Sequence, residues 1–257
     1  DIIVFNRSFN DFSNIAFRGN SYETLEAYAR KVETRVDKKT RVETRTIISS
    51  PDELAAATLE GFTVTEDMLG NYSQTTYGRT APSRSSEETP DGLYHLHFVP
   101  KKLTREVSAV LHIEGLNNIR SATCRLGGVA ESIFLATGKT SANTVTQEFT
   151  PSNPEFSPGS PFNGTLSCEF EIFGLNVIDN NNLHLDALLV DGKTEFEGDC
   201  TNVKITENDD GTGSVTLILE ASTEKVPDVK PEGGAGSGFD VDVDGWGNEI
   251  NTDIPIN

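Results

Sequence analysis

The residues from Leu93 to Gly115 constrain the fold more than any other part of the sequence. Hydrophobic and polar side chains alternate there with a period of two on both sides of Pro100. Such alternation is typical of β-strands with one buried face and one solvent-exposed face. Proline has no amide hydrogen to donate within a sheet, so Pro100 is predicted to divide the stretch into two strands. We interpret the first as the last strand of one domain and the second, Leu103–Glu114, as the first strand of another.

Short segments with strand character continue after Gly115, separated by Gly, Asn and Pro residues. They are Ile119–Leu126, Ala130–Thr137, Thr144–Phe149, Gly164–Phe173, Leu183–Val190, Thr201–Thr206 and Ser214–Ala221. Closely spaced strands separated by turn signals predict a β-sandwich or a β-barrel. The sequence therefore predicts an all-β protein with two domains, residues 1–100 and residues 101–257.

The first domain is predicted to mix strands with minor short helices. Asp1–Phe5 and Val42–Ile48 have strand patterns. In Tyr22–Val36 the apolar residues recur every three to four positions, which predicts a weakly amphipathic helix. A second helix is predicted over Pro51–Glu60, because Ser50 is a suitable N-cap and proline favours the first helical position.

The end of the chain is predicted to be a β-hairpin that follows a flexible linker. Residues 227–238 are rich in Pro and Gly, which is typical of a linker. The hairpin, residues 239–257, carries alternating apolar side chains that could serve as a partner strand: Phe239, Val241, Val243, Ile250, Ile254 and Ile256. An isolated two-stranded hairpin is at best marginally stable in water, so this one must dock on its own domain or on a neighbouring subunit.

The negative net charge argues against nucleic acid and anionic membranes as partners. The net charge of −19 lies mostly after residue 100, and so acidic a surface repels nucleic acid and anionic lipid. No apolar run reaches the roughly 20 residues of a membrane-spanning helix. Two of the three cysteines, Cys124 and Cys168, are predicted to be buried, and Cys200 is the best candidate for an exposed thiol. No zinc-type cysteine spacing is present, and no cofactor is expected.

Candidate chemical sites are weak. Asp240, Asp242 and Asp244 form DxDxDG, the opening of a calcium loop, but Asn251 stands where the bidentate Glu of an EF-hand would be. An acidic strand that ends in an Asp-Gly turn explains the pattern better, so no metal site is predicted.

Histidines give no clearer site. His95 and His97 share a strand face, as do His184 and Asp186, but no third metal ligand and no nucleophile elbow accompany them. No catalytic residue is assigned.

Four segments carry a resemblance to a known family. They are IAFRGNSYETLEAYAR, FVPKKLTREVSAVLHIEGLNNI, SATCRLGGVAESIFLATG and FDVDVDGWGNEINTDIPI. In this order they resemble the fimbrillin superfamily of Bacteroidales, in particular the branch that contains anchor subunits of the minor and major fimbriae. The resemblance implies two tandem transthyretin-like Greek-key β-sandwiches, the first of them without its opening strand. It also implies a fimbrial location at the outer membrane and assembly by β-strand addition between subunits.

The expected function is that of a non-enzymatic fimbrial or fimbrial-anchor-like subunit that supports adhesion. Its expected partners are other fimbrial subunits and host or bacterial surface ligands, with membrane contact only through a lipid anchor upstream of Asp1. The alternative is a surface glycan-binding lipoprotein on a similar scaffold, which is weaker because Trp246 is the single tryptophan. An unrecognised hydrolase comes third.

Overall fold

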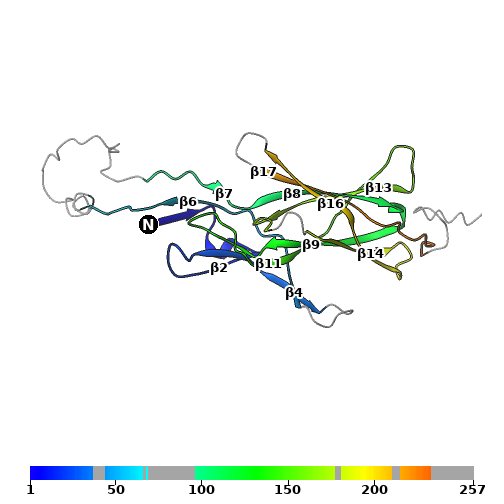
Figure 1. Cartoon of the computed structure of the whole chain (residues 1–257), viewed down its shortest axis with the longest axis horizontal. Coiled ribbons are helices and arrows are strands. Elements are labelled where there is room, and N and C mark those ends of the chain that lie inside the picture. Colours follow the sequence, from blue (N-terminus) through cyan, green and yellow to red (C-terminus); the bar gives the residue numbers. More distant parts are fainter. Residues whose placement is uncertain (37–43, 66–67, 69–95, 177–180, 210–214, 233–257) are drawn as a thin grey trace, which may run out of the picture.

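The computed structural model describes residues 1–36, 44–65, 68, 96–176, 181–209 and 215–232, and these residues confirm the all-β class. The strands form an elongated body with two layers, and the N-terminus lies towards one end (Figure 1). Two 3-10 turns, Phe9–Asp11 and Leu116–Asn118, interrupt the strands. Within the described residues, no helix is long and apolar enough to cross a bilayer.

One layer contains a five-stranded sheet with the order β12-β13-β8-β17-β16. Its strands are β12 (Asn153–Phe156), β13 (Asn163–Ile172), β8 (Arg105–Glu114), β17 (Val215–Ser222) and β16 (Thr201–Asp209). The central strand β8 buries Val107, Ala109, Leu111 and Ile113 on one face, as the period-two pattern predicts. The strand ends at Glu114. Gly115 follows with a φ of 88°, and a side chain there would collide with the backbone of Val226.

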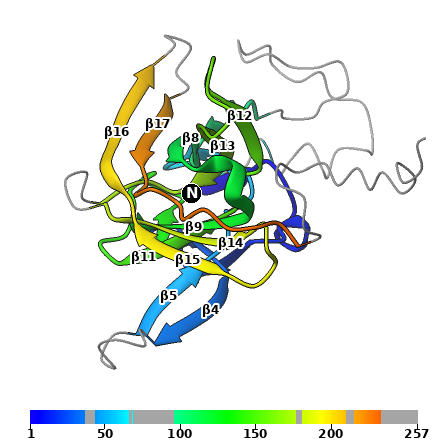
Figure 2. The same ribbon diagram turned by 90° about the vertical axis from the view of Figure 1, so that its right-hand side faces the viewer.

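The other layer contains a six-stranded sheet with the order β15-β14-β9-β11-β5-β4. Its strands are β15 (Glu195–Asp199), β14 (Leu183–Leu189), β9 (Ile119–Ala130), β11 (Thr144–Phe149), β5 (Thr44–Ile48) and β4 (Lys31–Val36). Strands β4 and β5 extend away from the body (Figure 2).

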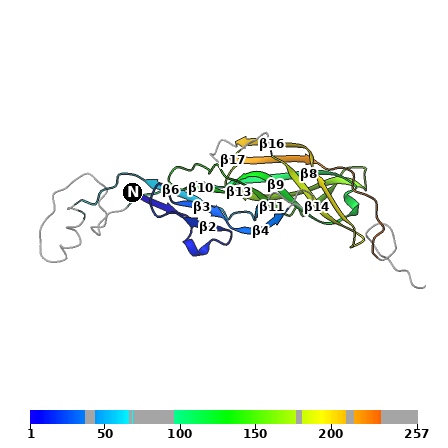
Figure 3. The same ribbon diagram turned by 60° about the horizontal axis from the view of Figure 1, so that its bottom comes forward.

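Two three-stranded sheets lie at the end of the body that holds the N-terminus (Figure 3). One has the order β1-β6-β7, from β1 (Ile2–Phe5), β6 (Ala55–Leu59) and β7 (Lys101–Lys102). The other has the order β10-β3-β2, from β10 (Ser132–Phe134), β3 (Glu26–Ala29) and β2 (Ile15–Arg18).

A single hydrophobic core runs between the layers. In it, the rings of Phe149 on β11 and Phe170 on β13 stack with centroids 4.3 Å apart. Near the N-terminus, Phe5 stacks on Phe17 at 5.4 Å, so aromatic packing also joins the two small sheets. Because an apolar strand face is stable only when it is covered, the two layers hold each other in place.

Both predicted helices are wrong. The residues of the first form β3 and β4, and half of the second forms β6, which pairs with β1. Ser50 is not an N-cap: its hydroxyl accepts a hydrogen bond from the Glu171 amide at 2.9 Å, across to β13. Tertiary pairing therefore overrides a local capping signal here.

The strand predicted before Pro100 is absent from residues 96–100, the part of that segment that the structure describes. Residues 96–100 have no strand assignment, and Leu96 and Val99 are exposed. The break that Pro100 was expected to cause is followed by the short strand β7 and then by β8.

Strands from both sides of residue 100 share sheets. β5 pairs with β11, β3 pairs with β10, and β6 pairs with β7. The division into residues 1–100 and 101–257 stays a prediction. For residues 1–100 to separate from residues 101–257 as an independent domain, the hydrogen bonds of these three strand pairs would have to break.

The three thiols are protected by burial. Burial raises the pKa of Cys168 and of Cys200 to about 11, and it also raises the pKa of Cys124 well above its usual value. Cys124 is buried as predicted, whereas Cys168 and Cys200 are both half-buried, so Cys168 is more exposed and Cys200 less exposed than their positions suggested. We expect alkylation by iodoacetamide at pH 8 to be more than about 100-fold slower in the folded protein than in urea, because only the thiolate reacts. Mass spectrometry of timed samples checks this, and fast labelling of Cys200 in the folded state would contradict it.

Candidate functional site

A polar cluster lies on the small sheet β10-β3-β2, around Arg18 and Glu26. These residues face each other across β2 and β3. The Arg18 guanidinium donates to both carboxylate oxygens of Glu26, with Nε–Oε2 at 2.7 Å and the second contact at 3.0 Å. Ser132 of β10 donates its hydroxyl to the same carboxylate. A bidentate, charge-assisted contact of this kind fixes both strands in one register.

The carboxylate of this cluster is held in its charged form. Only 8% of Glu26 is exposed, and its pKa is lowered, chiefly by the hydrogen bond from Arg18 and also by the one from Ser132. The pKa of Arg18 is raised by the same contact. The guanidinium also lies over the ring of Tyr28, 5.1 Å from its centroid, which adds a cation–π contact.

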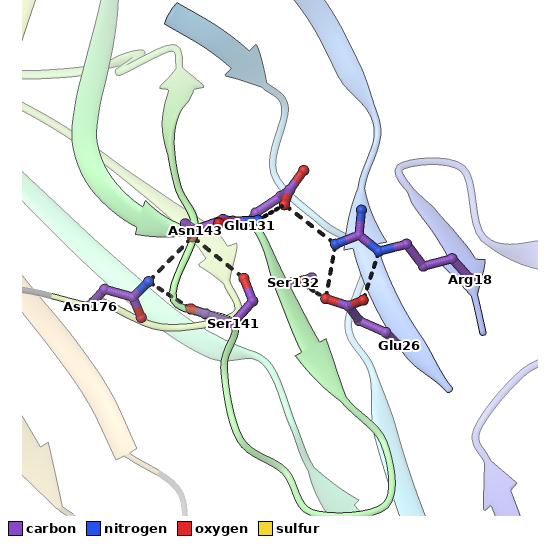
Figure 4. Close-up of polar contacts among 7 residues, drawn as sticks. All are labelled: Arg18, Glu26, Glu131, Ser132, Ser141, Asn143 and Asn176. Carbon is purple, nitrogen blue, oxygen red and sulfur yellow. Dashed lines mark hydrogen bonds and ion pairs between the residues drawn. The ribbon is translucent and has the colours of Figure 1, made fainter. Parts of the chain in front are cut away.

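The cluster continues into loops that follow residue 130 (Figure 4). Arg18 reaches the Glu131 carboxylate at 3.4 Å, and the Asn143 side chain donates to the same oxygen at 3.1 Å. The Asn176 side chain donates to the backbone carbonyl of Ser141 at 2.7 Å. These contacts connect the small sheet to loops from the later part of the chain.

A second set of charges lies on the β9-β14-β15 part of the six-stranded sheet. Arg125 contacts Glu148 at 3.1 Å and Asp186 at 2.5 Å. His184 Nε2 lies 3.2 Å from Asp186, and its Nδ1 lies 2.9 Å from Asp199. The prediction that His184 and Asp186 are neighbours on one face is therefore confirmed.

A cleft of about 510 Å³ opens beside β7, β8 and β10. Its lining includes the apolar residue Phe173 and the basic residues Lys102 and Arg105. Lys102 pairs with Glu171 at 2.6 Å, and Arg105 pairs with Glu207 at 2.8 Å. Carboxylates thus neutralise two of the three basic residues that line the cleft, the third being Lys139.

The sheet β1-β6-β7 has an edge at β1. Strand β1 is apolar, and no described strand lies on its outer side. The Asn6 amide donates to the Ala55 carbonyl at 3.1 Å. Because backbone groups of an antiparallel strand point alternately to either side, the amides of Ile3 and Phe5 face away from β6. Such unpaired groups can accept a further strand.

The site residues predicted in the tail lie outside the described residues. The calcium candidates Asp240, Asp242 and Asp244 lie outside the described residues, as does Trp246. The same holds for the partner-strand residues Phe239, Val241, Val243, Ile250, Ile254 and Ile256. Of the paired histidines, His95 also lies outside, and His97 is exposed in a segment without strand assignment.

Sequence reasoning missed the cluster around Arg18 and Glu26. Glu26 was assigned to a helix. Its partner Ser132, and Glu131, the partner of Arg18, are each more than 100 residues away along the chain from the residue that they contact. The spacing of apolar residues carries no signal for such contacts. The only available signal was the alternation in IAFR, Ile15–Arg18, which fits a strand.

A comparison with protein-family models assigns residues 1–150 to the domain of unknown function DUF5119. This match covers more than half of the chain. The chain belongs to the DUF5119 family. The DUF5119 region crosses residue 100 and runs from β1 to the end of β11, so it contains Arg18, Glu26 and Ser132 but not His184.

A search of curated proteins finds no match to this DUF5119 protein. Among solved structures it is similar to a crystal structure of a candidate adhesin from Bacteroides ovatus, with 16% sequence identity and a TM-score of 0.47. The alignment covers 77% of this chain and 63% of the other, so the chain spans less than two thirds of that protein's length.

Proposed function

We propose that this chain is a non-enzymatic structural subunit of an adhesive assembly at the cell surface, of the fimbrial or fimbrial-anchor type. The observation that carries the proposal is the apolar outer edge of β1, which leaves backbone donors and acceptors ready to pair with a strand of another subunit. The resemblance of four sequence segments to fimbrillins supports the same function.

Assembly would proceed by β-strand addition. An incoming strand would pair with the outward amides and carbonyls of Ile3 and Phe5 and would extend the sheet β1-β6-β7. Main-chain hydrogen bonds would supply affinity, and the alternating side chains of the incoming strand would supply specificity. The partially buried Ile3 and Phe5 already pack against the core, so the edge is held in a strand conformation before a partner arrives.

The proposed function also includes a cellular location, binding partners and a domain arrangement. A lipid anchor upstream of Asp1 would hold the protein at the outer membrane, and other fimbrial subunits would be its partners. Host or bacterial surface molecules would be the adhesion ligands. Two tandem transthyretin-like sandwiches would be the domain arrangement of such a subunit.

The experiment that tests strand addition removes one outward amide. Ile3→Pro deletes the Ile3 N–H from the free edge without deleting a hydrogen bond to β6. We expect the variant to remain monomeric under conditions in which the wild-type chain self-associates or binds purified subunits, with a melting temperature within a few degrees of wild type. Size-exclusion chromatography with light scattering measures the association.

A matched control is Lys102→Pro at the opposite edge of the same sheet. The Leu103 amide donates inward to Leu54 at 2.7 Å, so the Lys102 amide faces outward by the same alternation. The control should associate like wild type, apart from any effect of losing the Lys102–Glu171 ion pair on stability. If Ile3→Pro associates as well as wild type, β1 is not the assembly edge.

A further inference from the structure

The hairpin β14–β15 carries a group of metal-ligating side chains that the proposed function does not use. One ligand atom from each of His184, Asp186 and Glu197 lies within 4.8 Å of the other two. The group comes from two antiparallel strands in direct register, with Asp186 opposite Glu197 and His184 opposite Asp199. Strand pairing therefore brings all four side chains to one face.

Like charges directly opposite each other on paired strands are destabilising. Asp186 and Glu197 form such a pair, and Asp199 adds a third carboxylate beside His184. Arg125 compensates part of this charge through Asp186 Oδ2, at 2.5 Å. The other oxygen of Asp186 faces His184, so the arrangement favours a further cation between the histidine and the two carboxylates of Asp186 and Glu197.

Contacts from Asp199 and Arg125 orient the metal-ligating atoms of His184 and Asp186. His184 Nδ1 lies 2.9 Å from Asp199 Oδ1, and the tautomer that donates from Nδ1 to this carboxylate carries its lone pair on Nε2. Carboxylates on the far nitrogen of metal-binding histidines commonly set the tautomer in this way. Arg125 in turn holds Asp186 through Oδ2 and leaves Oδ1 directed at Nε2, 3.2 Å away.

That separation is close to the one a metal ion needs. Ligand atoms bound tetrahedrally to zinc at 2.0–2.2 Å lie roughly 3.3–3.6 Å apart. The pair formed by His184 and Asp186 therefore has the required spacing already. Glu197 is exposed and has to move only its side chain to complete the set.

We propose that His184, Asp186 and Glu197 bind a divalent transition-metal ion of the Zn²⁺ class on the outer face of the β14–β15 hairpin. The imidazole ligand selects such ions over Mg²⁺ and Ca²⁺, which prefer oxygen ligands throughout. Three protein ligands leave one tetrahedral position for water or for a group of a partner. The ion also ties the edge strand β15 to β14.

The test is isothermal titration of the EDTA-treated full-length chain with ZnCl₂, repeated in excess Mg²⁺. We expect one ion per chain, no competition by Mg²⁺, and a melting temperature that rises with added Zn²⁺ because the ion binds the folded state. His184→Ala and Glu197→Gln should each weaken binding by at least about 100-fold. Asp199→Asn should weaken it about 10–100-fold, the usual cost of losing a group that orients a ligand.

The matched control is His112→Ala, which removes an exposed histidine from β8 in the other layer. It should bind Zn²⁺ like wild type. Circular dichroism checks that each variant is folded, and exposed Glu197 provides a variant with little risk to folding. If the wild-type chain does not bind Zn²⁺, or if the ion binds His184→Ala and Glu197→Gln as tightly as wild type, the site does not exist.

Discussion

Replacing Ile48 with alanine is expected to lower the free energy of unfolding by about 2–5 kcal/mol. Ile48 is 1% exposed and belongs to β5, where it pairs with Gln147 of β11 within the six-stranded sheet. Truncation removes three carbon atoms from a closely packed site, so the cost combines lost burial with the cavity that remains. Urea unfolding followed by circular dichroism and by fluorescence measures the change.

The same experiment tests how residues 1–100 relate to residues 101–257. Ile48 precedes residue 100 and packs in a core built mostly from later residues. We therefore expect one cooperative transition that moves as a whole to lower urea concentration, and coincident transitions by both probes. Two separate transitions, with only one of them shifted, would support two independent domains instead.

Val32→Ala is the control for this prediction. Val32 lies on the neighbouring strand β4 and is 57% exposed. Its truncation should change the free energy of unfolding by no more than about 0.5 kcal/mol. A loss at Val32 equal to the loss at Ile48 would mean that sensitivity does not follow burial in this sheet.

Replacing Glu26 with glutamine is expected to cost about 2 kcal/mol at pH 7. Hydrogen bonds to charged groups contribute about 1.5–3 kcal/mol. The loss should stay below the upper end of this range, because the Arg18 side chain is 44% exposed and water can bind its guanidinium in the variant. The exposed residue Glu23 precedes β3 in the same region, so Glu23→Gln is the control and should be close to neutral.

The effect of Glu26 should depend on pH in a defined direction. Its pKa is lower in the folded protein than in the unfolded chain, so the unfolded chain binds the proton more readily. The stabilisation is therefore complete above the ordinary carboxyl pKa of about 4.3 and is lost as the pH falls through the folded pKa. Below about pH 5, the free energy of unfolding of wild type should fall faster than that of Glu26→Gln.

A double-mutant cycle tests whether Glu26 stabilises the protein through its contact with Arg18. Arg18→Met and Glu26→Gln should together cost less than the sum of the two single changes, because both remove the same contact. Additive costs at pH 7 would mean that Glu26 stabilises the sheet β10-β3-β2 through Ser132 and burial, and not through Arg18.

The sequence by itself determined the elements whose signal is local. Strand β8 is the clearest case: alternation of Val107, Ala109, Leu111 and Ile113 requires only that one face be buried, and all four are. The strands β9, β11, β13, β14 and β17 were recognised for the same reason, with shifts at their ends. His184 and Asp186 were placed together because residues two apart in a strand share a face.

Only the tertiary structure decided the elements whose local signals were ambiguous. The apolar spacing of Tyr22–Val36 is compatible with a helix, but Glu26 finds its partners on β2 and β10, and the segment becomes β3 and β4. Ser50 is likewise a good helix cap by type, yet it bonds to the backbone of Glu171, 121 residues away.

Local sequence patterns also did not predict the side-chain clusters around His184 and Arg18. Glu197 and Asp199 join His184 and Asp186 only through the register of β14 against β15, and Arg18 meets Glu131 only because β3 pairs with β10. Periodicity tells which face of a strand is buried. It does not tell which strand lies beside it, because that choice depends on the free energy of contacts between residues far apart in the chain.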